Sequence, residues 1–522
     1  MPSSADWRFR KCLPCSRRRW SIWRWIACVV VPDLPLPKGL PLPKGSLMKP
    51  PSSWRLPARI ANPGLVAAAC WLLGGCASAP LPDAPMPPPP AHAWNSPAPV
   101  TAWPTAQWWH ELGSSELDRL IADAETTNDD LAAAQARLTQ ANAQARIAGA
   151  DLLPQIGADI GGGDTQRLLS NGAKRRYAST DVELAASWQV DVWGRASAGA
   201  RAARATAQAA QDDLAAMRML VIATVARAYL DLKANDDQIA CAQAAARSAQ
   251  ALALDMDEEA RHGIMAQQAV AQQRILASQA EGAIPPLQAS RVHLVLSIAL
   301  LTGHSPEGFS VHGGALDALT LPPVMAGLPA QLLIHRPDVA AAERALAAAG
   351  GNIDAARRAL LPSIDLTASG GVASVALNGL ASEPTSVFDF GAGILAPIFD
   401  GGRLKGQVRL AQARYVELAA DYRKAVLGAM VDVEDALSAE RYARLADEQQ
   451  DAALADAQRV LEATGMAVHA GTLDRQALWH AQAQAVDARS RKIAALLART
   501  QGLVSLYAAL GGGWTVPDAH AP

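Results

Sequence analysis

The chain of 522 residues has few aromatic side chains, no long apolar run and almost no net charge. Phe, Tyr and Trp together make up 5% of it, and the formal net charge is −2. A nearly neutral chain gives no electrostatic reason to expect nucleic-acid binding. Because 18 consecutive apolar residues never occur, the sequence does not predict a transmembrane helix. Alanine is the commonest residue, which favours long helices packed through small side chains.

Six cysteines occur, and their positions favour neither a metal site nor a disulfide framework. They are Cys12, Cys15, Cys28, Cys70, Cys76 and Cys241. The first two have the spacing of half a zinc site, but no second pair follows them, so we interpret the spacing as chance. Cys241 stands alone in the main part of the chain. The sequence therefore predicts no metal site and no disulfide.

The amino-terminal region has the order of a secretory signal. Residues 1–47 precede a second possible start at Met48, and we interpret them as an upstream extension from a start codon assigned too early. Residues 48–75 contain a basic region and then a short apolar region. They end in Leu-Gly-Gly, immediately before Cys76. This order predicts a signal peptide that is removed at Cys76.

The four residues that end in Cys76 resemble a bacterial lipobox. That resemblance implies that the cysteine becomes the lipidated first residue of the mature chain, and this covalent lipid is the only cofactor we expect. The alternative is a small buried cysteine in an ordinary signal peptide. Ala77 follows rather than Asp, which by the same resemblance favours delivery to the outer membrane. Residues 76–104 are rich in proline and are interpreted as an extended tether.

A repeat organises the rest of the chain. A stretch that opens with Leu-Leu-Pro at Pro154 and closes with Gly-Arg at Arg195 recurs at Pro362 and Arg403. Both pairs of residues are 208 positions apart. Accidental similarity between alanine-rich helices would not keep proline, glycine and arginine in register. We therefore interpret the pattern as a tandem duplication.

Each copy of the repeat contains two runs in which apolar and polar residues alternate. The apolar members are even-numbered: Ile156, Ala158, Ile160 and Val182 to Val192 in the first copy, and Ile364, Leu366, Ala368 and Phe388 to Ile398 in the second. Such alternation predicts strands with two different faces. An Asn-Gly pair at 171–172 or 378–379 makes each copy a hairpin, with strands at about 154–192 and about 362–399. A tilted strand of about ten residues crosses a bilayer, so we expect four membrane strands whose even-numbered residues face lipid.

Long stretches without proline follow both copies. Residues 196–259 would span roughly 95 Å as one helix, and residues 404–466 form a similar stretch. A glycine, Gly263 or Gly471, ends each of them, and a return helix is expected after it. In the first repeat this return helix should break at Pro285 and Pro286.

The domain boundaries follow from the repeat. The first repeat is assigned to residues 105–306, the second to 307–515, and residues 516–522 are a tail. Gly303 and Gly511, which are also 208 positions apart, close the two repeats. The predicted fold class is mostly α with a pair of β-hairpins, built as an internal tandem repeat.

Together these elements resemble the outer-membrane factors of tripartite RND-type efflux systems, the TolC/OprM-like lipoproteins of the NodT type. The resemblance is carried by Cys76, Trp108, Trp109, Asp130, Leu131, Leu153, Pro154, Leu361, Pro362, and the runs 193–195, 336–338 and 397–403. It implies a passive efflux duct and not an enzyme. It also implies a homotrimer in the bacterial outer membrane, whose long helices form a coiled-coil tunnel into the periplasm. The implied partners are outer-membrane lipid, a periplasmic adaptor (membrane fusion protein) and an inner-membrane pump.

Four membrane strands cannot close a barrel by themselves, because bacterial barrels need at least about eight. An open edge in lipid leaves backbone groups unpaired at several kcal/mol each. The chain must therefore oligomerise or lie elsewhere. Two copies would supply eight strands and three would supply twelve, and the resemblance implies three.

Two other functions stay open at this point. One is a periplasmic coiled-coil scaffold that is anchored by lipid without spanning the membrane. The other is the exit duct of a type I secretion system. Outward apolar faces on the hairpins would favour a duct, because a scaffold has no use for them.

The resemblance also implies where an adaptor is met and where the channel closes. The candidate tip and adaptor-contact residues are Gly263, Ile264, Gly471 and Thr472. Family members carry Leu-Asp-Ala-Gln with the acid nine residues after the tip glycine, whereas this chain has Trp-His-Ala-Gln with His480 in that place. The candidate constriction residues are His480 and Asp474. We hypothesise that three His480 side chains meet at the axis; the alternative is that His480 packs on Trp479 and another ring closes the pore.

Groups that suggest catalysis have simpler interpretations. His335, Arg336 and Asp338 could perform acid–base chemistry, but Asp after Pro suits the positive end of a helix. The acid pairs 212–213 and 236–237 are expected on solvated faces of the first long helix. Gly161 to Gly163 lack the helix and lysine of a phosphate loop. No enzyme is predicted.

Overall fold

The computed structural model describes residues 80–88, 94–95, 103–168, 171–322, 332–375, 379–382 and 385–514. All of these fall within one unit of the chain, residues 67–522. The predicted lipidation site Cys76, the signal segment and the tail lie outside the described residues.

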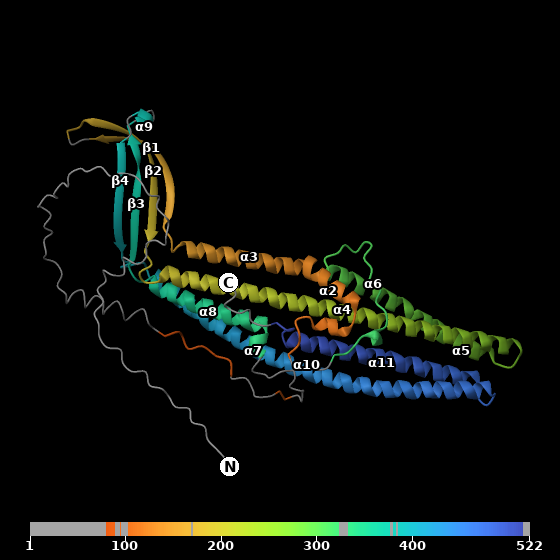
Figure 1. Cartoon of the computed structure of the whole chain (residues 1–522). Helices are drawn as coiled ribbons and strands as arrows, with labels where there is room; N and C mark the ends of the chain where they lie inside the picture. The colour runs from red at the N-terminus through yellow and green to blue at the C-terminus, as the bar shows by residue number, and fades with distance from the viewer. Residues whose placement is uncertain are drawn as a thin grey trace, which may run out of the picture. The chain divides into compact units, whose positions relative to one another are not determined.

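Helices dominate the described chain, and four strands lie side by side in one sheet (Figure 1). The first half contains η3 (Trp108–Leu112), α2 (Ser115–Thr127), α3 (Asp129–Ala150), β1 (Gln155–Leu168), β2 (Lys174–Gln189), α4 (Arg195–Arg261), α5 (Gln267–Gly282), α6 (Ile284–Leu301) and η4 (Leu316–Ala318). The second half contains α7 (Leu332–His335), α8 (Pro337–Arg358), β3 (Ser363–Ser374), α9 (Gly379–Ser382), β4 (Thr385–Leu395), α10 (Arg403–His469) and α11 (Arg475–Ala509).

The two halves repeat each other at a constant distance along the chain. Helices α4 and α10 are both 67 residues long, which corresponds to about 100 Å. They begin at Arg195 and Arg403 and end at Arg261 and His469, so both ends are 208 positions apart. The predicted tandem repeat and the two long helices are confirmed.

The return helices differ between the halves. In the first half the return is split into α5 and α6, and Pro285 lies in the first turn of α6 rather than at the break. A proline fits there because the first backbone N–H groups of a helix have no partner within it. The second half has isoleucine 208 positions later, at Ile493, and α11 runs through it without interruption.

The sheet has the order β1-β2-β3-β4, and neighbouring strands are antiparallel. Its register places Ile160 opposite Val182, Val182 opposite Val372, and Ala368 opposite Phe390. Even-numbered residues therefore stay on one face across all four strands. That face is apolar and exposed at Ile156, Ile160, Leu184, Phe388, Phe390 and Ile394, each at least 62% exposed. The predicted shared face is confirmed.

Three details of the hairpins differ from the prediction. The strands β2 and β4 end at Gln189 and Leu395, although the alternation continues to Val192 and Ile398. Pro397 has no N–H for the ladder, and Asp191 instead caps the following helix. The second connection contains the short helix α9, whereas the first has the expected Asn-Gly turn with Gly172 at φ 78°. Asn378 lies outside the described residues.

One large core joins the two halves. It surrounds the middle of α4 and draws apolar side chains from η3, α2, α6 and α11. Tyr229 of α4 and Tyr507 of α11 are each 1% exposed, and the ring centroids of Trp108 and Tyr507 are 5.2 Å apart. Cys241 is free and buried in this core. The repeats therefore fold as one body rather than as two separate domains.

The prediction that the acid pairs of α4 lie on solvated faces was wrong for Asp212, Asp236 and Asp237, whereas Asp213 is exposed as expected. Asp212 is 2% exposed and forms an ion pair with Arg344 of α8. Burial raises the pKa of the Asp212 carboxyl, and Arg344 offsets part of that rise. Asp236 accepts a 2.7 Å hydrogen bond from Arg291, and Asp237 accepts one of 2.8 Å from the backbone N–H of Leu316. The reason is that α4 is covered by other helices along much of its length.

The described part of the proline-rich tether contacts the second half. The Trp103 indole N–H donates to the carbonyl of Leu510 at 3.0 Å, and its ring stacks on His335 with centroids 4.3 Å apart. Arg357, near the end of α8, donates to the carbonyl of Pro80 at 2.8 Å. The described residues Pro80 and Trp103 of the tether are thus held near the two ends of α8.

Among the described helices, one stretch is apolar and long enough to cross a membrane by length and mean hydropathy alone. It is Gln267–Leu301, and 11% of its most apolar window is buried. The sequence did not predict it, because Arg274 and Arg291 interrupt the apolar residues. Val292, Leu296 and Leu300 are exposed at a spacing of four residues and form a stripe on α6.

Candidate functional site

The junction between strands and helices is built in the same way in both halves. Glycine precedes each long helix in the left-handed conformation, Gly194 at φ 78° and Gly402 at φ 89°. An aspartate then caps the exposed N–H groups. Asp191 accepts from Ser197 N at 2.8 Å, and Asp400 accepts from Leu404 N at 2.8 Å.

In both caps the pKa of the aspartate carboxyl group is lowered. Burial raises the pKa of Asp191, but hydrogen bonds from Ser197 and Ala196 outweigh it and leave the pKa below its usual range. The hydrogen bond from Leu404 N lowers the pKa of Asp400. The two aspartates are 209 positions apart rather than 208, so the repeat slips by one residue here while the caps are preserved.

Two tryptophans fasten the first hairpin at this junction. The Trp193 indole N–H donates to the carbonyl of Pro362 at 2.6 Å and so links the two halves. The Trp188 indole N–H donates to the carbonyl of Leu152 at 3.1 Å. Trp188 is one residue from the end of β2, although the predicted alternating run of Val182 to Val192 would place it near the middle of a strand. An aromatic ring at a strand end suits the interfacial girdle of a membrane strand.

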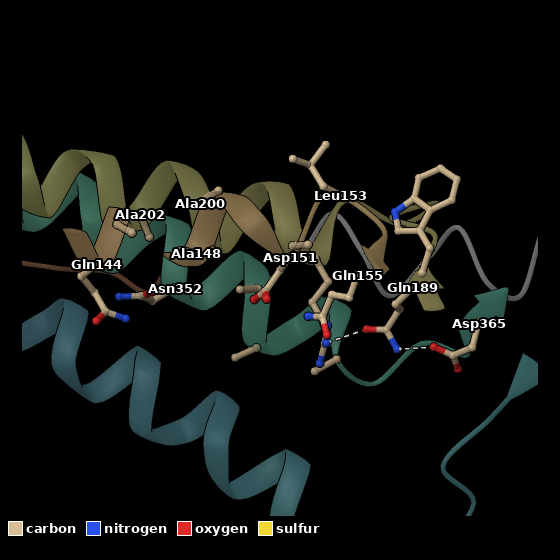
Figure 2. Close-up of a pocket in the computed structure, with 18 of the residues that line it drawn as sticks. Gln144, Ala148, Asp151, Leu153, Gln155, Gln189, Ala200, Ala202, Asn352 and Asp365 are labelled. Carbon is tan, nitrogen blue, oxygen red and sulfur yellow. Dashed lines mark hydrogen bonds between the residues drawn. The ribbon is translucent and has the colours of Figure 1, made fainter. Parts of the chain in front are cut away.

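A groove of about 870 Å³ lies where β1, β2 and β3 meet α3, α4 and α8 (Figure 2). Polar side chains line it: Gln144, Asp151, Gln155, Gln189, Asn352 and Asp365. The three of these that lie on strands are odd-numbered and so lie on the face opposite the apolar one. The sheet thus has one apolar face and one polar face that continues into the helices.

A hydrogen-bond chain crosses this groove between the halves. Arg195 donates to the side-chain oxygen Oε1 of Gln189 at 2.8 Å, and the side-chain Nε2 of Gln189 donates to Asp365 at 3.0 Å (Figure 2). Ser363 donates to the other Asp365 oxygen at 3.0 Å. The sequence did not predict this chain. The only sequence feature that could have pointed to it is the position of Arg195 in the closing motif of the repeat.

The predicted tips are tight helix ends. Gly263 and Gly471 have φ 70° and 73°. After Gly263 the backbone N–H of Ile264 donates to Glu259 at 3.0 Å, and after Gly471 that of Thr472 donates to Ala467 at 2.9 Å. This is the hydrogen-bond pattern in which a left-handed glycine satisfies the last carbonyls of a helix.

Close to the tips, α11 contacts α4 and α5. Trp479 packs against a small apolar cluster of α4 and α5 that includes Met256 and Val270. Arg475 forms an ion pair of 2.6 Å with Asp255 of α4. The first two turns of α11 therefore hold the second helical pair against the first. Sequence reasoning missed both contacts, because they join residues more than 200 positions apart.

The two constriction candidates differ in their surroundings. Asp474 caps α11 by accepting from the backbone N–H of Ala477 at 2.8 Å. His480 is exposed and meets the ring of Trp479 edge to face, with centroids 4.8 Å apart. Within a single chain, one side of the His480 ring contacts Trp479 and the other side is exposed to solvent.

The Arg-Pro-Asp motif, residues 336–338, stands at the connection between α7 and α8 and does not form an acid–base site. Arg336 is 7% exposed and donates to Asp338, to Asp432 at 3.0 Å and to the carbonyl of Ala509 at 3.1 Å. Helix α8 begins at Pro337, as expected. The motif ties the start of α8 to α10 and α11. Within the described residues, no group of three or more His, Cys, Asp and Glu side chains could hold a metal ion.

Comparison with known proteins matches this architecture. The sequence profile of the outer membrane efflux protein family fits residues 120–304 and again 328–512, at the same separation of 208. The chain belongs to the outer membrane efflux protein family. Its location in the outer membrane and its role in efflux follow from this membership.

Individual relatives agree over most of their length. The pyoverdine export outer membrane protein OpmQ of Pseudomonas putida is 33% identical over 436 residues, which cover 82% of this chain and 92% of OpmQ. The probable outer membrane lipoprotein SilC of Salmonella typhimurium is 28% identical and covers 85% of this chain and 97% of SilC. The open-state structure of the MtrE outer membrane channel of Neisseria gonorrhoeae has a TM-score of 0.73 at 28% identity, covering 84% of this chain and 98% of MtrE.

Proposed function

We propose that three copies of this chain form a passive duct through the outer membrane and across the periplasm. The duct is the outer component of a tripartite pump, and it receives its cargo from a periplasmic adaptor and an inner-membrane pump. The observation that carries the proposal is the sheet with one exposed apolar face and two unpaired edges, β1 and β4. In lipid, an open sheet edge costs several kcal/mol for each unpaired backbone group.

Joining β4 of one copy to β1 of the next removes these edges and gives about twelve strands in a trimer, a number within the range of bacterial barrels. The even-numbered apolar residues then face lipid, and the polar groove lines the passage. The stripe of Val292, Leu296 and Leu300 on α6 supports association of the helical parts, since exposed apolar stripes of this kind favour a partner. A periplasmic scaffold would instead leave the apolar sheet face in water.

The long helices support the periplasmic part of the proposal. At about 100 Å each, α4 and α10 extend well beyond the thickness of a bilayer, which is about 30 Å in its hydrocarbon core. Their ends at Gly263, Ile264, Gly471 and Thr472 are the surface we assign to the adaptor. These turns are exposed, and a Cβ added at Gly263 or Gly471 would meet no atom within 4 Å.

The experiment is restoration of export in a strain that lacks its own outer-membrane channel, adaptor and pump. We expect the chain to restore resistance to the pump's substrates when it is expressed together with its own adaptor and pump, and to fail when the adaptor is omitted. Restoration without any adaptor would contradict the tripartite assembly. The same strain with type I secretion components would show whether the chain serves as that exit duct instead.

The lipid on Cys76 is part of this proposal, since the lipoprotein SilC is a relative over most of its length. Cys76→Ser should abolish incorporation of radioactive palmitate, because the hydroxyl does not replace the thiol in lipidation. Cys70→Ser, in the same signal segment, is the matched control and should be labelled like the wild type. Continued labelling of the Cys76 variant would place the anchor elsewhere.

For the closed end of the duct we propose a ring of three His480 side chains, one from each copy. Three imidazole rings that meet at one axis would narrow the closed end of the duct. His480→Ala removes those rings, so its conductance in planar bilayers at a fixed pH should exceed that of the wild type. Equal conductance of the two proteins would show that His480 only packs on Trp479 and that another ring closes the pore.

A further inference from the structure

The outer end of the first hairpin carries a cluster of bases. Residues 164–176 contain four of them, Arg167, Lys174, Arg175 and Arg176, and one acid, Asp164. This end lies farthest along the strands from α3 and α4, which join the other end (Figure 1). The corresponding end of the second hairpin, residues 374–386, contains no base and one acid. The cluster is therefore not a property of the repeat.

Two of these bases, Lys174 and Arg176, have described side chains that are open to solvent. Arg176 forms an ion pair with Asp164, yet its side chain remains 78% exposed, and Lys174 is exposed as well. One carboxylate cannot neutralise four bases, so the hairpin end retains a net charge of +3.

The position of two of these bases relative to the apolar face identifies what they would meet. Lys174 and Arg176 are even-numbered and therefore lie on the same face as Val182 and Leu184. Eight residues separate Arg176 from Leu184, which is about 26 Å along the strand and about 20 Å in height for a tilt of about 40°. Half of a bilayer including its headgroups is about 20–22 Å. If Leu184 is near the midplane, these bases lie at the level of lipid phosphates.

We propose that the outer end of hairpin β1–β2 binds the phosphate groups of lipopolysaccharide in the outer leaflet. This inference rests on the proposed function, because it requires the hairpin to span the membrane. Arginine binds phosphate with two parallel hydrogen bonds, and lysine binds it as a compact charge. The ligand is the anionic lipid headgroup. Its phosphates neutralise the positive charge that the single carboxylate of Asp164 leaves.

The test uses the full-length protein in detergent and two probes, lipid A with both phosphates and the same lipid after removal of its phosphates. We expect the wild type to bind the phosphorylated lipid A at least tenfold more tightly. K174Q/R176Q should weaken that binding roughly thirtyfold, since each base near an anionic lipid surface contributes about a factor of five. R423Q/K424Q removes two exposed bases of α10 and is the charge-matched control, which should bind like the wild type.

Equal binding of the two lipids, or equal binding by wild type and K174Q/R176Q, would overturn the proposal. So would a change in the ratio of anion to cation permeability in K174Q/R176Q without a change in lipid binding, because the bases would then serve anionic cargo at the mouth of the duct. The conductance of every variant in bilayers free of lipid A separates the lipid-binding proposal from the proposed function. A variant that conducts but does not bind lipid A has lost only the lipid site, whereas a wild-type protein that does not conduct would contradict the proposed duct.

Discussion

Leu184→Arg should lower the free energy of unfolding in a membrane by about 2–4 kcal/mol, the cost of an arginine on the lipid face near the midplane. Leu184 is 62% exposed in the single chain and lies opposite Ala158 and Gly370, well inside β2. The arginine would have to stay in hydrocarbon or distort the strand to reach water. Urea unfolding of the protein folded into lipid vesicles measures the difference.

Glu183→Arg is the matched control for this change. Glu183 immediately precedes Leu184 in β2, lies on the polar face and is opposite Asp159, which can pair with the new base. We expect a change within about 0.5 kcal/mol, as for surface substitutions elsewhere. A larger loss from Glu183→Arg than from Leu184→Arg would mean that the polar face meets lipid and that the two faces are assigned the wrong way round.

Gly511→Ala should destabilise the protein by about 2–5 kcal/mol, through overpacking and left-handed strain together. Gly511 has φ +90°, and a Cβ placed on it would lie 1.8 Å from the carbonyl oxygen of His335. The backbone of α7 or the end of α11 must move to admit the methyl group. Thermal or urea unfolding would detect this as a lower midpoint with unchanged cooperativity.

The control for this change is Gly199→Ala within α4. A Cβ at Gly199 meets nothing within 4 Å, and alanine is favoured over glycine inside a helix by about 1 kcal/mol. Gly199→Ala should therefore leave stability unchanged or raise it. If Gly511→Ala were equally harmless, the contact between the end of α11 and α7 would not be part of the folded protein.

The periodic features of the fold could be predicted because they depend on local sequence. The separation of 208 residues located both long helices, and proline-free stretches bounded by glycine gave their ends to within a few residues. Alternation of apolar and polar residues placed Leu184 and Phe390 on one face, and the register confirms this. The strand ends were less certain, because alternation continues past Pro397, where the ladder has already stopped.

Features that depend on tertiary packing could not be predicted in the same way. An acid on a helix looks solvated until the neighbouring helices are known, and Asp212 is buried where other helices cover α4 and where it forms an ion pair with Arg344 of α8. Likewise, the pairing of Arg475 with Asp255 joins residues that no local pattern relates. The candidate tips followed from glycine positions alone, whereas the contacts that hold α11 against α4 required the structure.

The most direct test of the trimeric duct is made on the purified protein from outer membranes. Electrophoresis in SDS without heating should show a band of about three chain masses that converts to the single chain on boiling, as expected for a closed membrane barrel. The unheated species should conduct ions when it is added to planar bilayers. A single-chain band in both samples, together with bilayers that stay non-conducting, would contradict the account.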